Sequence, residues 1–578
     1  MNLKSYFPIS EWITTYTGTQ LKGDLAAGLT VGVMLIPQGM AYAMIAGLPP
    51  IYGLYASTLP LIIYALLGTS RQLAVGPVAM VSLLTAAGIG TLAEAGTETF
   101  IQLAIVLALM VGTIQFLLGV FRLGFLVNFL SHPVISGFTS AAALIIGLSQ
   151  LKHLLGVEIA RSHHVHEIIL GAVEQFGAIN WVTFGIGIGG IILIKGIKRL
   201  NKAIPGSLLA VLFGILAVWG FSLTGAGVKI VGEVPSGLPS FQMPTFSLET
   251  LQTLLPVALA ISLVSFMESI AVAKAIQAKH KDYKVVPNQE LIALGLANIG
   301  GSFFLSYPVT GGFSRTAVND QAGAKTGLAS IFSAALIILT LLFLTPIFYY
   351  LPKAILASII MVAVFGLIDI KEPLHLWKTD RSDFWMLIVT FIGTLTLGIE
   401  MGIGLGVILS LAMIIFETTR PHMAVLGKVP GRPFYRNKER FKQVEERPEL
   451  LIVRFDARLY FANLGFFQNK LEEWIKEKGE ALQTIIINAE SINSLDSSAL
   501  HLLEELVIDL RANKTEVYFS GVKGPVRDQL LRAGLLNKIG ENNFFMTVQE
   551  AVDYHDQQQP GAPAEFQEYT LQANERRF

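Results

Sequence analysis

The chain has 578 residues, of which 52% are hydrophobic and 15% are charged, and its formal net charge is zero. Soluble domains carry about 25% charged residues, so membrane segments explain this length better than three or four soluble domains do. Zero net charge gives no global field that favours nucleic acid. The absence of cysteine excludes disulfides, thiol catalysis and cysteine-ligated metals.

Apolar stretches separated by short polar joints recur from about residue 25 to residue 418. Each full-length stretch can cross a hydrocarbon core about 30 Å thick, so we predict a polytopic α-helical membrane protein. The fourteen predicted segments are 25–46, 50–67, 77–91, 99–120, 128–151, 180–198, 205–223, 251–276, 288–303, 314–322, 326–348, 352–368, 384–399 and 402–418.

Two of these segments are short and follow extended approaches broken by proline and glycine. The third follows Gly76-Pro77, and the tenth follows the sequence PVTGG at 308–312. We interpret both as half-helices, although each alone is also compatible with an ordinary kinked helix. In a seven-plus-seven inverted repeat, the third and the tenth segments occupy equivalent positions. In such repeats, facing half-helices direct their N-termini at a site near the membrane midplane.

Basic residues in the joints indicate the orientation. On the side shared by the two termini, they cluster at 195–202, 274–284 and 371–381. The opposite side carries about four: Lys152, Arg161, Lys229 and Lys353. The positive-inside rule therefore predicts that both termini are cytoplasmic. We expect the protein to lie in the plasma membrane, which in a bacterium is the inner membrane.

The pattern after residue 420 is that of a small soluble domain. We predict a transmembrane domain over 1–419, a basic linker over 420–448, an α/β domain over 449–555 and a disordered polar tail over 556–578. Strands over ELLIVRFDARLYFAN, TIIINAESI and EVYFSGV alternate with helices over LGFFQNKLEEWIKEK, SSALHLLEELVIDLRAN and VRDQLLRAGLL. This alternation predicts a sheet covered by helices.

Arg315 falls at the start of the second half-helix. An arginine within a membrane is costly, and Asp320, five residues further on, is not on the same helix face. Two helix N-termini and one arginine would favour an anion. The alternative is that Arg315 snorkels or pairs with a carboxylate elsewhere.

Glu268 is the only ionisable residue in LQTLLPVALAISLVSFMESIA. Burial favours the neutral form of a carboxyl, so Glu268 is suited to exchange a proton. A charged carboxylate beside an anion site would repel the substrate and a protonated one would not, which predicts proton–anion coupling. The alternative is a structural ion pair with Arg315 or with a lysine such as Lys274.

Two weaker signals remain. Gln38 and Tyr42 are four residues apart on one helix face and would line the site or join two helices. Asp496, Ser497 and Ser498 open a helix of the soluble domain. Such residues are commonly an N-cap, and the functional alternative is a phosphorylatable or anion-binding regulatory site.

Other signals point to no chemistry. The glycines at 185–190 and 402–406 lie in apolar spans and are interpreted as helix-packing residues. His163, His164 and His166 lie in a polar joint, so we predict no metal site. No nucleophile–base pair stands out, and we predict neither an enzyme nor a cofactor.

Long motifs carry a family resemblance. DLAAGLTVGVMLIPQGMAYAMIAGLPPIYGLYAS, GTSRQLAVGPVAM and TGGFSRTAVNDQAGAKT resemble the SulP family of anion transporters, and the DSSAL helix resembles a STAS domain. The resemblance covers about residues 20–550. It implies core and gate domains that move as an elevator, usually in a homodimer. It also implies an anion site formed by Gln38, Tyr42, Val78, Ala79, Ser314 and Arg315.

Glu268 resembles the acidic position of proton-coupled sulfate transporters, so we expect sulfate as the small-anion substrate and protons as the coupling ion. A sodium-coupled bicarbonate or dicarboxylate transporter is the alternative within transport. A membrane receptor that signals through the STAS domain is the alternative from another class.

Overall fold

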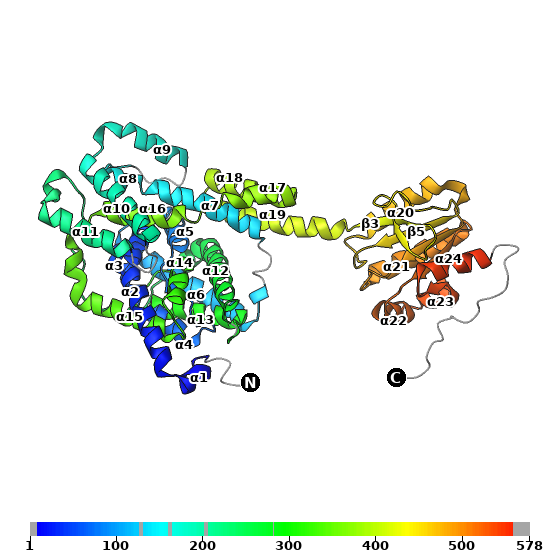
Figure 1. The fold of residues 1–578 in the computed structure, drawn as a ribbon, viewed down its shortest axis with the longest axis horizontal. Coiled ribbons are helices and arrows are strands. Elements are labelled where there is room, and N and C mark those ends of the chain that lie inside the picture. Colours follow the sequence, from blue (N-terminus) through cyan, green and yellow to red (C-terminus); the bar gives the residue numbers. More distant parts are fainter. Residues whose placement is uncertain (1–7, 126–130, 160–164, 201–205, 281, 559–578) are drawn as a thin grey trace. The chain divides into compact units, whose positions relative to one another are not determined.

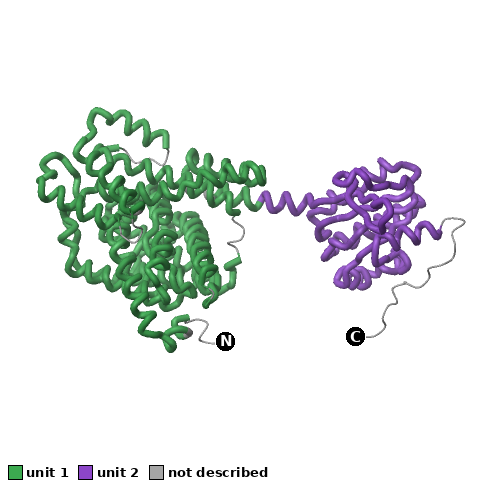
Figure 2. The backbone as a smooth tube through the Cα atoms, in the orientation of Figure 1, with its two compact units in different colours: residues 1–411 green, residues 412–578 purple. Residues whose placement is uncertain are grey.

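The computed structural model describes residues 8–125, 131–159, 165–200, 206–280 and 282–558, with the backbone alone at 11, 198, 399, 400 and 403. Arg161, His163 and His164 therefore lie outside the described residues, as does most of the expected tail. The chain divides into two compact units, residues 1–411 and 412–578 (Figure 2).

Every one of the fourteen predicted membrane segments corresponds to helical structure (Figure 1), and the boundary between the two units falls within the last of them. The first seven are α2 (Gly18–Ala46), α3 with α4 (Ile51–Tyr55 and Leu59–Leu67), α5 (Ala79–Gly90), α6 (Glu98–Val120), α7 (His132–Ser149), α10 (Trp181–Leu200) and α11 (Gly206–Gly220). The second seven are α12 (Leu248–Gln277), α13 (Pro287–Ser302), α14 (Phe313–Gln321), α15 (Leu328–Leu339, continued by η6, Thr340–Leu344, and η7, Thr345–Tyr350), α16 (Lys353–Phe365), α18 (Arg381–Leu397) and α19 (Ile399–Thr419).

Four short helices among the described residues of the first unit were not predicted, because each is too short or too polar to give a membrane signal. They are α1 (Ile9–Trp12), α8 (Leu151–Leu155), α9 (Val165–Glu174) and α17 (Lys371–Thr379). Among the described residues, five continuous helical stretches are long and apolar enough to cross a membrane alone. The half-helices α5 and α14 are not among these five.

Helix packing within the first unit follows a seven-plus-seven repeat. α2 packs against α15, and the equivalent pair α12 and α6 also packs together. The pair α4 and α15 has its equivalent in α13 and α6, and the pair α10 and α16 has its equivalent in α18 and α7. Each of these three pairs thus has an equivalent pair seven segments further along the chain, as expected for inverted repeats.

Glycines allow the closest of these helices to approach. A Cβ atom at Gly112 of α6 would lie 2.6 Å from the backbone nitrogen of Ile299, and one at Gly295 of α13 would lie 2.5 Å from that of Phe116. Small residues have this role in membrane helix pairs. In the glycine-rich stretch 185–190, Gly187 and Gly190 contact neighbouring segments, whereas Gly185 and Gly189 have open space beside them.

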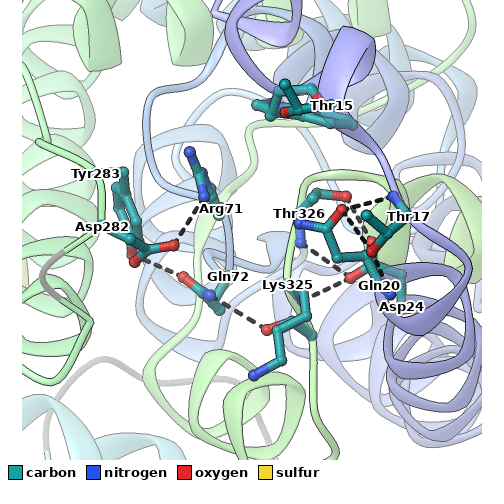
Figure 3. A network of polar contacts seen from close by, with 12 residues as sticks. Thr15, Thr17, Gln20, Asp24, Arg71, Gln72, Asp282, Tyr283, Lys325 and Thr326 are labelled. Atoms are coloured by element: carbon teal, nitrogen blue, oxygen red, sulfur yellow. Dashed lines mark hydrogen bonds and ion pairs between the residues drawn. The ribbon is translucent and has the colours of Figure 1, made fainter.

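A buried carboxylate joins the start of α2 to the turn before α15 (Figure 3). Asp24 Oδ1 accepts hydrogen bonds from the backbone N–H groups of Lys325 at 2.6 Å and Thr326 at 2.9 Å. Its Oδ2 accepts from the hydroxyls of Thr326 at 2.6 Å and Tyr16 at 2.9 Å. Since Asp24 is fully buried, the four donors replace its hydration.

Asp24→Ala is expected to reduce the free energy of unfolding by roughly 1–3 kcal/mol, because one buried and one partly buried backbone donor lose their acceptor. The measurement is thermal unfolding of the purified protein in detergent. Glu233→Ala is the matched control, because Glu233 is exposed. Equal stability of the two variants would contradict a structural role for Asp24.

The second unit is a six-stranded sheet in the order β4-β3-β5-β6-β7-β8. Its strands are β3 (Met423–Lys428), β4 (Tyr435–Asn437), β5 (Leu450–Phe455), β6 (Thr484–Asn488), β7 (Glu516–Ser520) and β8 (Phe544–Phe545). β5 to β8 are parallel, and β3 is antiparallel to β5. Its helices are α20 (Leu464–Lys478), α21 (Ser497–Ala512), α22 (Gly524–Arg532), α23 (Leu535–Ile539) and α24 (Val548–Gln557). The sheet has a core on each face, α20 to α23 contributing to one and α24 to the other.

The prediction of a linker over 420–448 was wrong, because β3 and β4 lie within this range and extend the sheet. Ala424, Val425 and Leu426 of β3 are buried, but the proline, glycine and basic residues that follow them concealed this short strand in the sequence. The expected tail also begins later, since α24 continues to Gln557.

Candidate functional site

Two short strands bring the starts of the half-helices together. β1 (Val75–Gly76) precedes α5 and β2 (Thr310–Gly311) precedes α14. The strands are antiparallel, with Val75 opposite Gly311 and Gly76 opposite Thr310. Gly76 has a φ of +149°, which favours glycine. The first turns of α5 and α14 therefore begin close to each other, and each provides backbone N–H groups without intrahelical partners.

The neighbouring helices hold β2 in place. Ser269 of α12 accepts a hydrogen bond from the N–H of Gly311 at 2.8 Å and shares one with the hydroxyl of Thr310 at 2.7 Å. Asn298 of α13 bonds to both backbone groups of Val309, accepting at 2.8 Å and donating at 3.0 Å. These bonds satisfy extended backbone that would otherwise be unpaired inside the membrane unit.

α14 is fixed to the chain before α5 in the same way. Thr316 accepts a hydrogen bond from the N–H of Ala74 at 3.0 Å, and Asn319 donates to the carbonyl of Gln72 at 2.9 Å. Four residues that make these bonds were not among the predicted site residues: Ser269, Asn298, Thr316 and Asn319. Asn298 and Ser269 had a usable signal, since they are polar side chains within apolar helices.

Arg315 is buried at the start of α14, with 2% of its surface exposed. Its Nη1 donates to the carbonyl of Pro77, directly before α5, so the arginine of one half-helix contacts the start of the other. Its Nε and Nη2 are buried and have no hydrogen-bond partner among the described residues. A Cβ atom at Gly312 would lie 3.0 Å from Nη2, so glycine leaves room for the guanidinium there.

One cavity of about 490 Å³ connects the residues that the sequence selected. Those that line it are Gln38, Tyr42, Val78, Ala79, Glu268, Ser314 and Arg315. Gln38 and Tyr42 share their face of α2 with Thr30 and Met34, which also line the cavity. The structure thus brings the seven side chains together from α2, α5, α12 and α14, although their spacing in the chain gave no distance between them.

Neither of the two charged residues in this cavity forms an ion pair among the described residues. No carboxylate lies within 4.0 Å of the Arg315 guanidinium, and Glu268 has no basic group within that distance. Asp320 pairs with Lys279 at 3.2 Å and with His280 at 2.5 Å instead. The structural ion pair of Glu268 with Arg315 or Lys274, considered from the sequence, is therefore not formed.

The predicted regulatory residues lie in the second unit. Asp496 is the N-cap of α21, and its Oδ1 accepts from the N–H of Ala499 at 2.8 Å. Its Oδ2 accepts from the N–H of Phe461 at 2.9 Å. Ser497 and Ser498 are exposed in the first turn. Asp496 thus has the ordinary capping role, and a regulatory role of the two serines stays a prediction.

The packing of the helices and the paired half-helices define a polytopic membrane protein built from two inverted sets of seven segments, with a second α/β unit. The chain belongs to the sulfate permease family, whose model matches residues 21–390, and residues 441–551 match the STAS domain. The resemblance noted in the sequence is thereby confirmed.

Named relatives match nearly the whole chain. "Sulfate transporter 4.1, chloroplastic" of Arabidopsis thaliana is 40% identical over 568 residues, which cover 95% of this chain and 82% of the relative. "High affinity sulfate transporter 2" of Stylosanthes hamata is 36% identical over 577 residues, which cover 96% of this chain and 86% of the relative.

Solved structures share the fold. The murine Solute Carrier 26 family member A9 anion transporter in the inward-facing state has a TM-score of 0.88 at 25% identity, and the match covers 96% of this chain and 94% of that one. The transmembrane domain of the cyanobacterial bicarbonate transporter BicA has a TM-score of 0.60 at 22% identity, covering 68% of this chain and 98% of that one.

Proposed function

We propose that this chain is a secondary active transporter of inorganic anions and that it carries sulfate together with protons. The observation that supports this most is the guanidinium of Arg315, buried at a cavity where two half-helices begin, whose Nε and Nη2 have no hydrogen-bond partner among the described residues. The relatives that are 36% and 40% identical are named sulfate transporters, which supports sulfate as the substrate.

The charges around the cavity suit an oxyanion. Each helix N-terminus carries about half a positive charge, and Arg315 adds a full one. Buried Nε and Nη2 are free to donate two parallel hydrogen bonds, the geometry in which guanidinium binds oxyanions. Gln38 and Tyr42 of α2 and Ser314 of α14 also line the cavity and offer further polar groups. A tetrahedral dianion such as sulfate would use all of these groups.

Glu268 would supply the coupling. It lines the same cavity as Arg315 and has no ion-pair partner among the described residues, so its charge is not neutralised. A charged carboxylate would oppose entry of the anion, whereas the protonated form would accept it. Anion and proton would then cross together. A sodium-coupled carrier is the alternative, and dependence on sodium would identify it.

The cavity would face the cytoplasm. From Tyr42 it extends along α2 to Thr30, and it also reaches Ser207 and Leu367 beside joints that the basic residues place inside. An elevator movement of the core (α2–α6 and α12–α15) against the gate (α7–α11 and α16–α19) would expose the site to the other side. We expect a homodimer with both termini in the cytoplasm.

Counterflow with labelled sulfate tests the substrate. Proteoliposomes loaded with unlabelled sulfate should take up labelled sulfate, and external sulfate should compete better than bicarbonate or succinate. Stronger competition by bicarbonate or succinate would favour the alternative carrier. Absence of exchange for every anion would favour the alternative function, a membrane receptor that signals through the STAS domain.

Removal of the second unit is expected to leave the choice of anion unchanged, because all seven predicted site residues lie in the first unit. A chain that ends at Arg420 should show the same order of competition in counterflow as the full chain, even where its rate or expression is lower. A changed order would contradict a regulatory or assembly role for the STAS domain.

A further inference from the structure

Three lysines gather around one cavity away from the central site. A cavity of about 500 Å³ is lined by three lysines: Lys152 of α8, Lys353 of α16, and Lys229, which lies in the connection between α11 and α12. His153 and Glu158 also line this cavity. These lysines are three of the four basic residues that the sequence places on the side opposite the termini. Basic residues are scarce on that side, so their convergence on one cavity requires an explanation.

The backbone fixes two of the lysines beside each other. The N–H of Lys353 donates to the carbonyl of Lys229 at 3.0 Å, and the N–H of Val231 donates to the carbonyl of Leu351 at 2.8 Å. Adjacent backbones allow the two ammonium groups to approach each other in the cavity that both side chains line, and like charges that approach repel each other unless an anion compensates them. One acidic residue does so in part, since Glu158 pairs with Lys229 at 3.0 Å. With the Glu158 side chain 91% exposed, the pair is weak.

The lysine cavity adjoins a larger one. A second cavity, of about 810 Å³, shares three lining residues with the lysine cavity: Lys152, His153 and Ile159. The larger cavity is bounded by Met44 of α2 and Leu83 of α5. These two helices also carry Tyr42 and Ala79, which line the central cavity. The lysines therefore lie on a chain of cavities that approaches the central site from the side opposite Thr30 and Ser207.

We propose that Lys152, Lys229 and Lys353 form a second, weak binding site for inorganic oxyanions at the outer mouth of the protein. Even with Glu158 ionised, the cavity has an excess of positive charge. A concave site of one sign concentrates counter-ions, and here these are the proposed substrate of the central site. That this face is outside and that the anion is sulfate rest on the proposed function; binding at the lysines does not.

Protection of lysines from acylation tests the site. The purified full-length protein is treated with a neutral amine-acylating reagent, with inorganic sulfate or with gluconate at equal ionic strength, and each lysine is followed by mass spectrometry. Sulfate should slow acylation of Lys229 and Lys353. Lys371, which is exposed on α17, should be acylated at the same rate in sulfate and in gluconate. Equal acylation of Lys229 and Lys353 with and without sulfate would overturn the proposal.

Two variants separate this site from the central one. In Arg315→Ala, protection of Lys229 and Lys353 should persist, and its loss would show that the effect came from the central site. In Lys353→Gln, protection of Lys229 should decrease, whereas in Lys371→Gln it should not. Unchanged protection of Lys229 in Lys353→Gln would overturn a shared site. A chain that fails to carry sulfate would refute the proposed function without altering these results.

Discussion

Arg315→Ala is expected to remove measurable anion transport while the protein still inserts and folds. The substitution removes the one full positive charge among the described residues that line the central cavity, and the bond that the guanidinium makes to the carbonyl of Pro77. Loss of one partner from a buried, hydrogen-bonded charge pair costs about 2–5 kcal/mol, which is roughly thirtyfold or more in affinity. Sulfate binding to the purified protein, measured by calorimetry, gives this change directly.

Conservative and control variants sharpen this test. Arg315→Lys should retain part of the affinity, because lysine keeps the charge but lacks the planar pair of donors. Arg381→Ala is the matched control, since Arg381 is an exposed arginine at the start of α18 that rests on Trp377. Sulfate affinity that is the same in Arg315→Ala as in the unchanged protein would disprove the central site.

Glu268→Gln is expected to abolish accumulation driven by a proton gradient while exchange of anion for anion continues. Glutamine resembles the neutral acid, so the anion still enters the cavity, but glutamine cannot release a proton on the other side. Glu268→Asp should keep some coupling with a displaced carboxyl. Accumulation and counterflow are measured side by side in the same proteoliposomes.

The other outcomes are equally distinct. A mainly structural role for Glu268 predicts misfolding or loss of both activities in the glutamine variant. The absence of an ion pair with Arg315 makes that result unexpected. Intact proton-driven accumulation in Glu268→Gln would exclude Glu268 as the coupling residue.

The half-helices were predictable because their cause is local. Proline and glycine at 76–77 and 308–312 interrupt apolar runs, and Arg315 is conspicuous where a charge is costly. The pairing of β1 with β2 was not predictable, since strands of two residues have no periodicity and their partners are far apart in the chain. The same holds for the bonds of Asn298 to Val309, which depend on how α13 packs.

In the second unit, three helices and the central strands were predicted from clear periodicity, as in α20 and β6, whereas α24 was not predicted. β3 was missed because it is short and is stabilised by its neighbour β5 rather than by its own pattern. The roles of Gln38 and Tyr42 were left open, because spacing places two residues on one face without showing what that face contacts. Their contribution to the cavity with Arg315 is a property of the folded chain.

Sulfate accumulation in proteoliposomes under defined gradients tests the central claim most directly. Labelled sulfate uptake is followed with an inward proton gradient, with an inward sodium gradient at equal pH, and with neither. Proton-coupled transport predicts accumulation above equilibrium with the proton gradient alone. Accumulation that requires sodium and does not respond to the proton gradient would contradict it.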